Sequence, residues 1–248
     1  MGTSAVASTM TAVSRPMRAT SAVQPGGEPP TARQLLSGPV RPTTLTCEVE
    51  PSAWTRTIAA DPEHSHRYAA RWRRLAAEGH DLLGEARLLD AMAGRGSRIL
   101  DAGCGTGRVG GHLATLGHTV VGVDVDPALI DYAEADFTGA TWLVSDLALL
   151  DLPSAGIVEP FDLVFAAGNV MAFLAPSTRV SVLKRLRDHL ADAGRLVVGF
   201  GAGRGYTFDA YFDDLATAGL TLDLTFSTWE LRPFSPASDF LVAAASKG

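Results

Sequence analysis

The chain has 248 residues, of which 46% are hydrophobic, and its formal net charge is −6 with an isoelectric point near 5.5. This composition can supply a sizeable core, and no apolar run reaches the roughly 18 residues of a membrane span, so we expect no membrane partner. The acidic balance argues against nucleic acid as substrate, because binding it usually leaves a basic surface. Two cysteines, Cys47 and Cys104, make no disulfide framework, which predicts a reducing, cytoplasmic setting.

Residues 1–46 are rich in Ser, Thr, Ala, Pro and Gly, with scattered Arg and almost no acidic or aromatic side chains. Such a segment buries too little apolar surface to offset the entropy lost on ordering, so we predict a disordered N-terminal tail. An organelle transit peptide, or a start codon assigned too far upstream, would have the same composition.

Residues 47–95 are predicted to form an N-terminal helical segment. Between Asp61 and Met92 two helical patterns are separated by Gly79. The first pattern places Tyr68 and Trp72 on one face, and the second places Leu82, Ala86 and Leu89 together. Both patterns precede the first strand.

From residue 96 to residue 248 strand-like and helix-like patterns alternate. The predicted strands are 99–100, 119–123, 141–144, 161–165 and 195–200, and the predicted helices are 109–116, 127–135, 180–190 (closed by Gly194) and 208–215. Strand, helix, strand throughout indicates an α/β fold with a doubly wound, mostly parallel sheet.

The pattern changes near the C-terminus. The runs 220–231 and 238–245 are both strand-like, and the Pro-containing loop between them leaves no room for a crossover helix. They must therefore pair antiparallel, which gives a mostly parallel seven-stranded sheet with an antiparallel last strand.

The most informative stretch is residues 98–108, Arg-Ile-Leu-Asp-Ala-Gly-Cys-Gly-Thr-Gly-Arg. A short apolar run meets Asp101, then glycines recur at every second position, and a helical pattern follows. Glycines tolerate positive φ and allow a ligand to approach the backbone, while the helix N-terminus offers unpaired N–H groups. This pattern predicts a strand, a ligand-binding turn and a helix start.

The same stretch contains a dinucleotide-type G-x-G-x-x-G from Gly105 to Gly110, and Asp124 follows at about 20 residues, near the spacing of that fingerprint. That fingerprint places its first glycine directly at the end of the strand, whereas here Asp101 and three more residues intervene. Asp101 would repel a diphosphate and attract an amine or sulfonium. We therefore expect a cationic ligand.

Residues 99–107 resemble motif I of the class I S-adenosylmethionine-dependent methyltransferases, small-molecule type, and Asp124 and Asp146 fall where that family has its next cofactor contacts. The resemblance covers about residues 64 to 245 and implies the Rossmann-like methyltransferase fold, with S-adenosyl-L-methionine as cofactor. It also implies that the 47–95 segment is a lid over the cofactor and that 96–248 is the catalytic domain.

By this resemblance Asp101 and the glycine turn hold the methionyl part, Asp124 accepts the ribose hydroxyls and Asp146 accepts the adenine amino group. All three acids are expected at the carboxyl ends of parallel strands, where ligands of such sheets bind. The full set of expected cofactor-binding residues is Asp101, Gly103, Cys104, Gly105, Gly107, Asp124, Val125, Asp146, Leu147 and Ala167.

The acceptor is expected to meet the loops after the fourth, fifth and sixth strands and the N-terminal helices. Asn169 resembles the polar residue that some family members place beside the target atom, and it is the candidate catalytic residue. The Asn-Pro-Pro-Tyr-like signature of nucleic-acid amino-methylating enzymes is absent, so we expect no nucleic acid partner. The expected substrate residues are Tyr68, Arg71, Arg204, Tyr206, Trp229 and Arg232. Of the remaining polar residues on the first helix, His64, His66, Arg67 and Arg73 can also reach the site unless they form a solvated face.

No His-Asp pair or metal-ligand cluster is visible in the predicted strand-end loops, so no metal is expected. His112, His118 and His189 are interpreted as surface residues. The sequence predicts a methyltransferase acting on an unidentified small molecule, as a monomer or homodimer. The alternatives are a cofactor-binding protein without catalysis (a sensor or partner subunit) and, less favoured, an NAD-dependent oxidoreductase.

Overall fold

The computed structural model describes residues 49–248. The predicted tail, 1–46, and Cys47 lie outside these residues. Within the described part, no helix combines the length and apolar character needed to cross a membrane.

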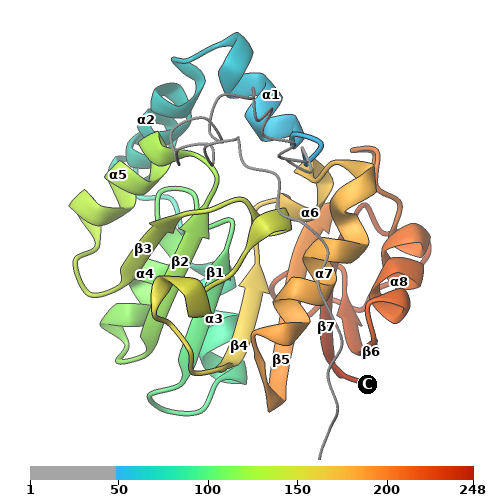
Figure 1. The fold of residues 1–248 in the computed structure, drawn as a ribbon. Coiled ribbons are helices and arrows are strands. Elements are labelled where there is room, and N and C mark those ends of the chain that lie inside the picture. Colours follow the sequence, from blue (N-terminus) through green and yellow to red (C-terminus); the bar gives the residue numbers. More distant parts are fainter. Residues whose placement is uncertain (1–48) are drawn as a thin grey trace, which may run out of the picture. The chain divides into compact units, whose positions relative to one another are not determined.

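The core is one seven-stranded sheet with the strand order β3-β2-β1-β4-β5-β7-β6 (Figure 1). The strands are β1 (Arg98–Ala102), β2 (Thr119–Asp124), β3 (Thr141–Val144), β4 (Phe161–Ala166), β5 (Leu190–Gly201), β6 (Leu220–Phe226) and β7 (Phe240–Lys247). The first five pair in parallel, whereas β7 runs antiparallel to both of its neighbours. This confirms the predicted fold. The reversed strand is last in the chain but lies inside the sheet, and β6 forms the edge.

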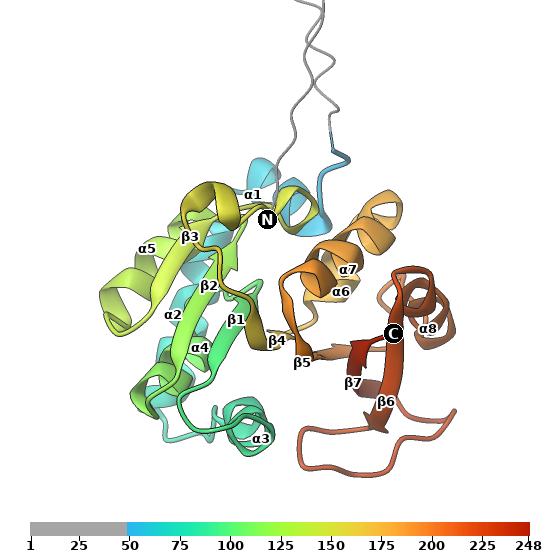
Figure 2. The same cartoon turned by 60° about the horizontal axis from the view of Figure 1, so that its bottom comes forward.

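Helices cover both faces of the sheet (Figure 2). On one face α3 (Gly84–Met92) and α4 (Arg108–Thr115) bury leucines such as Leu89 and Leu113 against Ile99 and Val120. On the other face α7 (Arg179–Asp188) and α8 (Phe208–Thr217) pack against the second core. Alternate residues of β1 enter opposite cores, Ile99 on the α4 side and Leu100 on the α7 side, which is the pattern of a strand buried on both faces.

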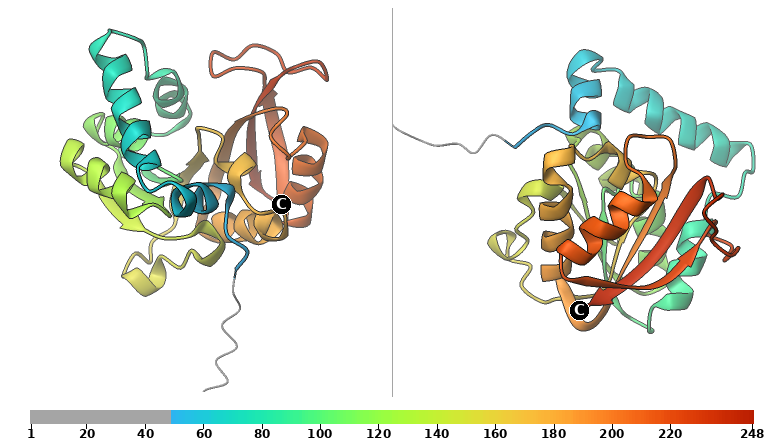
Figure 3. Two further views of the ribbon diagram at one scale, coloured as in Figure 1. Left: turned by 90° about the horizontal axis from the view of Figure 1, so that it is seen from above. Right: turned by 90° about the vertical axis from the view of Figure 1, so that its right-hand side faces the viewer.

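Two further helices, α1 (Ala53–Ala60) and α2 (His64–Ala77), lie beyond the end of the sheet at which the parallel strands finish (Figure 1). Seen from above, α1 and α2 follow one another along one side, and the loop between β6 and β7 lies across from them (Figure 3). Helix α2 also packs on α5 (Pro127–Asp136) through a bidentate Arg73–Asp136 ion pair. We call α1 and α2 together the lid.

Several boundaries differ from the predictions. Helix α1 was not predicted, although Ser52 caps it by accepting from the Thr55 N–H. The short helix α6 (Val170–Phe173) was also missed. Strand β6 ends at Phe226 rather than 231, because the chain then turns, with Leu231 at a φ of +63°.

Helix α7 ends before Leu190, and Gly194 does not close it. Strand β5 already begins at Leu190 and contains an irregularity in its pairing with β4. Gly194 lies inside this irregular segment, where a β-carbon would come within 2.7 Å of the Phe161 carbonyl oxygen. The glycine therefore permits a close backbone contact within the strand.

Candidate functional site

A cavity of about 770 Å³ lies between the lid and the carboxyl ends of the strands. Its size is within the usual range of roughly 300 to 1,000 Å³ for small-molecule sites. It is lined by the ends of β1, β2 and β3, by the loops after β4 and β5, and by the loop between β6 and β7. Nearly all of the predicted cofactor residues border it, namely Asp101, Gly103, Cys104, Gly105, Asp124, Val125, Asp146, Leu147 and Ala167.

The glycine turn after β1 forms the floor of this cavity. The N–H groups of Gly103 and Cys104 both donate to the Val123 carbonyl, at 2.8 and 3.0 Å, and hold the turn against β2. Gly105 has a φ of +55° and faces the Tyr68 ring, which would lie 3.8 Å from a β-carbon built on the glycine. Gly107 is different: it does not border the cavity, and a β-carbon there would meet Trp142 at 2.9 Å. In the structure Gly107 therefore packs against Trp142 and, unlike the other predicted cofactor residues, does not border the cavity.

Asp101 is only 2% exposed, and its carboxylate accepts one hydrogen bond, 3.1 Å from the Gly110 N–H of α4. Burial away from water raises the pKa of Asp101 to about 8, because the charged form loses its hydration. No basic side chain of residues 49–248 forms an ion pair with it. A buried acid with this environment is suited to a cationic ligand.

Asp124 holds the two neighbouring loops in place. One carboxylate oxygen accepts from the Gly105 N–H at 2.9 Å, and the other accepts from the Asp126 N–H at 3.0 Å. Burial raises its pKa to about 6 despite these bonds. Each oxygen has a second lone pair, and Asp124 borders the cavity, so the carboxylate can still accept from a ligand hydroxyl.

Asp146 follows β3 and caps the short turn Leu147–Leu149, where its Oδ1 accepts from the Ala148 N–H at 2.8 Å. Its other oxygen, Oδ2, has no hydrogen bond from within the described residues. Val125 and Leu147 border the cavity together with this acid. This part of the lining therefore combines apolar surface with one free acceptor, which suits an amino-substituted ring.

The lid is attached to the same loops through Asp126, a residue that the sequence analysis did not single out. Asp126 is buried, and its Oδ2 accepts from Trp54 Nε1 at 2.9 Å and from the Ser65 hydroxyl. Its Oδ1 caps α5 at the Ala128 N–H. Trp54 belongs to α1 and Ser65 to α2, so one carboxylate fixes both lid helices two residues after Asp124.

Aromatic rings line the lid side of the cavity. Trp54 meets Tyr68 and Phe173 edge-on, with ring centroids 5.2 and 5.9 Å apart. Helix α2 directs His64, Arg67, Tyr68 and Arg71 at the cavity, whereas His66 and Arg73 contact α5 through Tyr132 and Asp136. The first group, including Tyr68 and Arg71, therefore borders the cavity, and the second group does not.

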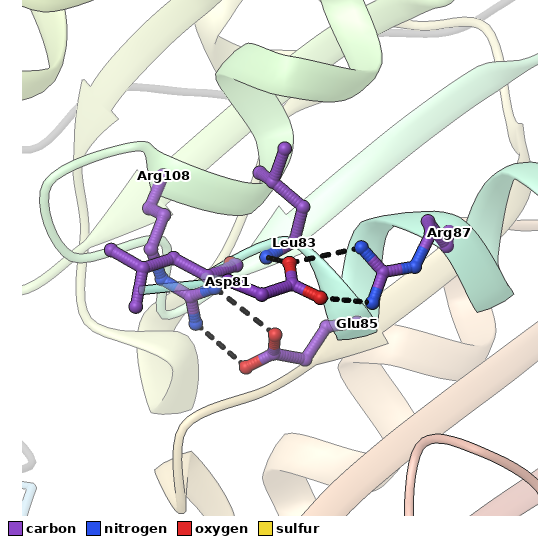
Figure 4. Close-up of polar contacts among 6 residues, drawn as sticks. Asp81, Leu83, Glu85, Arg87 and Arg108 are labelled. Carbon is purple, nitrogen blue, oxygen red and sulfur yellow. Dashed lines mark hydrogen bonds and ion pairs between the residues drawn. The ribbon is translucent and has the colours of Figure 1, made fainter. Parts of the chain in front are cut away.

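A half-buried ion pair supports the turn from the α3 side (Figure 4). Glu85 and Arg108 each expose 18% of their side chains and meet through two hydrogen bonds of 2.6 and 3.0 Å. Arg108 also donates to the Leu82 carbonyl and lies 4.7 Å from the Trp72 ring centroid. Because Arg108 is the first residue of α4, this contact joins α2, α3 and the glycine turn.

Asn169 lies after β4 in the left-handed region, with a φ of +69°. Asparagine adopts this region more readily than most residues, and non-glycine cases concentrate at functional sites. Its Oδ1 accepts from the Gly201 N–H at 2.8 Å, which joins the ends of β4 and β5. Asn169 and Ala167, two residues before it, both border the cavity.

The predicted acceptor residues of the later loops divide into two groups. Arg204 and Trp229 border the cavity. Tyr206 does not: it is 1% exposed, stacks on Phe200 and donates its hydroxyl to Asp214 at 2.7 Å, so this prediction was wrong. Arg232 was also misplaced, because the turn at Leu231 leaves it exposed and outside the cavity.

The histidines also need one correction. His118 is buried, and its Nε2 lies 3.0 Å from Asp90, so it is not a surface residue. His112 and His189 are half-buried. Among residues 49–248 no group of three His, Cys, Asp or Glu side chains is arranged to hold a metal ion.

Comparison with known proteins places this geometry in a family. The family described as "Methyltransferase domain" matches residues 99–194. A TehB-like SAM-dependent methyltransferase from Corynebacterium glutamicum is 51% identical, with a TM-score of 0.72, covering 76% of this chain and 100% of that one.

Two more distant proteins agree. Magnesium-protoporphyrin O-methyltransferase of Rhodobacter capsulatus is 35% identical over 132 residues, which are 50% of this chain and 53% of that protein, so the match spans about half of the curated relative. Magnesium protoporphyrin IX methyltransferase of Synechocystis, solved with bound SAM, shares the fold at 20% identity and a TM-score of 0.56, covering 78% of this chain and 97% of that chain.

The cavity also fits the cofactor of that family. Three acids without cationic partners in the described chain succeed one another at the ends of β1, β2 and β3, beside a turn whose glycines leave the backbone accessible. This donor set suits a ligand with a cationic end, a diol and an exocyclic amine. With the agreement of fold, turn and relatives, the chain belongs to the class I S-adenosylmethionine-dependent methyltransferases.

Proposed function

We propose that this chain transfers a methyl group from S-adenosylmethionine to a small-molecule acceptor. The observation that carries the proposal is the mixed lining of one cavity. The unpaired acids Asp101, Asp124 and Asp146 border it together with aromatic rings and arginines of the lid and later loops. The acids suit the cofactor, and the side chains of the later loops are left for an acceptor.

The cofactor residues have separate roles in this proposal. Asp146 accepts from the adenine amino group through its free oxygen, and Asp124 accepts from the ribose hydroxyls. Asp101 and the glycine turn hold the methionyl part. Hydrogen bonds to a charged acceptor contribute roughly 1.5 to 3 kcal/mol each, which makes Asp124 the largest single contributor.

When bound, S-adenosylmethionine supplies a methyl group on a sulfonium, so a nucleophile can bond to that carbon while the carbon–sulfur bond breaks and its electrons stay on sulfur. The chain must align the acceptor with that bond and exclude water. The lid provides the cover, since Asp126 holds α1 through Trp54 and α2 through Ser65. Asn169 is positioned to orient the acceptor between the ends of β4 and β5.

We also propose that the acceptor is not a nucleic acid and that the protein acts in the cytoplasm as a monomer or homodimer. The net charge of −6 supports the first point. The cysteine content supports the second, since the described cysteine, Cys104, is a buried free thiol.

Calorimetry with S-adenosylmethionine, S-adenosylhomocysteine and NAD tests the cofactor, and a screen of metabolites with labelled methyl donor tests transfer. We expect both adenosyl ligands to bind, NAD not to bind, and at least one small molecule to gain the label. Binding without transfer to any acceptor would favour the alternative of a sensor or partner subunit.

A further inference from the structure

The basic side chains that border the cavity differ in whether an acid neutralises them. Arg67 pairs with Asp61, and Arg108 pairs with Glu85. Arg71 and Arg204 have no acidic partner within residues 49–248. Two guanidinium groups are thus available to bind anions. Because S-adenosylmethionine has one carboxylate, one of them remains for another ligand.

Arg204 is the guanidinium nearer to the acceptor side. Gly201 ends β5, and a β-carbon built on it would lie 3.7 Å from Arg204 Nε and 3.5 Å from Asn169 Oδ1. Asn169 Oδ1 already accepts from the Gly201 N–H, which fixes the amide and leaves its NH₂ group as a donor. The Arg204 guanidinium and the Asn169 side chain therefore flank one small hollow above Gly201, which the Asp239 carbonyl oxygen also borders at 3.7 Å.

A flat apolar wall adjoins this hollow. Gly199 is two residues before Gly201, so both positions open to the same face of β5. The Trp229 indole lies directly over Gly199, where any β-carbon would collide with it. Phe240 of β7 pairs opposite Gly201, and directly opposed residues of antiparallel strands share a face. Trp229, Phe240, Asn169 and Arg204 all border the cavity.

We propose that this corner, made by Asn169, Arg204, Trp229 and Phe240, binds an acceptor that has a carboxylate attached to a flat, unsaturated ring. The proposal rests on the proposed methyltransferase function and names its substrate class. The planar guanidinium and the amide can donate to both carboxylate oxygens, while the ring lies against the indole. One uncompensated arginine matches a monoanion better than a phosphate dianion. The acids Asp101, Asp124 and Asp146 would repel the carboxylate and so disfavour its binding in the cofactor position.

The test uses benzoate as probe, with benzamide as its neutral isostere and inorganic phosphate as an anion without a ring. Each is titrated by calorimetry or ligand-observed NMR into the free protein and into its S-adenosylhomocysteine complex. We expect benzoate to bind at least about tenfold more tightly than benzamide, which corresponds to about 1.4 kcal/mol, and more tightly than phosphate. Equal affinity for benzoate and benzamide, no benzoate binding, or tighter binding of phosphate would each overturn the proposal.

Two variants locate the probe. Arg204→Met keeps the stem and removes the charge, and Gly201→Ala fills the hollow by one methyl group without a close contact, since the nearest atom lies at 3.5 Å. Both should weaken benzoate binding at least about tenfold while S-adenosylhomocysteine affinity stays within about twofold.

Arg232→Met is the matched control, because Arg232 is exposed outside the cavity and its loss should change neither affinity. If Arg204→Met leaves benzoate binding unchanged, or Arg232→Met weakens it equally, the corner is not the carboxylate site. Failure of S-adenosylhomocysteine to bind the wild type would instead refute the methyltransferase function, and the benzoate titration of the free protein would still decide the corner.

Discussion

Replacement of Asp101 by Asn tests the idea that this buried acid receives the cationic end of the cofactor. The carboxyl has one hydrogen bond and no ion-pair partner in residues 49–248, and burial raises its pKa to about 8. Before binding it is therefore mostly protonated at neutral pH. A cationic ligand favours the carboxylate, so binding below pH 8 must release a proton from Asp101.

The size of the effect follows from the ionised fraction. With a pKa of about 8, roughly 3% of the carboxyl is ionised at pH 6.5 and roughly 24% at pH 7.5. The affinity for S-adenosylmethionine should therefore rise about eightfold across this interval, or about 1.2 kcal/mol. Between these pH values Asp124, with a pKa of about 6, is mostly ionised, and the ligand amine is mostly protonated. The change in affinity therefore reports mainly on Asp101.

Calorimetry at both pH values, in two buffers with different ionisation enthalpies, measures the affinity and the released proton together. In the Asp101→Asn variant the eightfold rise and the proton release should both disappear. Ionisation of Asp101 has the opposite effect on the stability of the free protein, because rising pH strengthens cofactor binding but weakens the fold. The folded state binds more protons than the unfolded state between about pH 4 and pH 8, so its free energy of unfolding should fall with rising pH relative to the variant. A wild-type affinity that does not change with pH would refute the role given to Asp101.

Three further changes test other parts of the site. Asp124→Ala should weaken S-adenosylmethionine binding by roughly 2 kcal/mol or more in calorimetry. The control Asp131→Ala, on the exposed side of α5, should leave the affinity unchanged. Equal effects of the two variants would refute the ribose contact. Gly107→Ala should lower the free energy of unfolding in urea by roughly 1 to 3 kcal/mol, because of its φ of +74° and the contact with Trp142; an unchanged midpoint would contradict the packing role. Trp54→Phe keeps an aromatic ring at this position but loses the bond to Asp126. Limited proteolysis should therefore cut α1 faster, and the free energy of unfolding should fall by about 1 kcal/mol; unchanged cleavage would show that the lid does not depend on this bond.

The sheet and the glycine turn were predictable because their signals are local. The run Ile99–Leu100, the acid and the alternating glycines specify a strand, a turn and a helix within about a dozen residues. The short, Pro-containing connection before β7 specified its reversal in the same way. The end of α7 was not predictable, since the residues from Leu190 to Gly194 satisfy a helical pattern and a strand pattern equally, and pairing with Phe161 decides between them.

The residues that border the cavity were predictable where they directly follow a strand, but not where they lie within a longer loop. Arg204 and Tyr206 are two residues apart in one loop, yet Arg204 borders the cavity and Tyr206 joins the Phe200–Tyr211 core, where its ring buries more apolar surface. Asp126 shows another limit. Its sequence position before Pro127 indicates only a helix cap, because its partners Trp54 and Ser65 are 72 and 61 residues away.

The attachment of both lid helices to Asp126 has a consequence for exchanging parts between related enzymes. The lid meets the cofactor loop through one indole N–H and one serine hydroxyl, while the carboxylate corner at Arg204 belongs to a separate segment of chain. A graft of residues 53–77 from a relative should thus seat correctly if it keeps Trp54 and Ser65, which bind Asp126, and Arg73, which binds Asp136. The lid and the corner around Arg204 could then be varied in two independent mutant libraries.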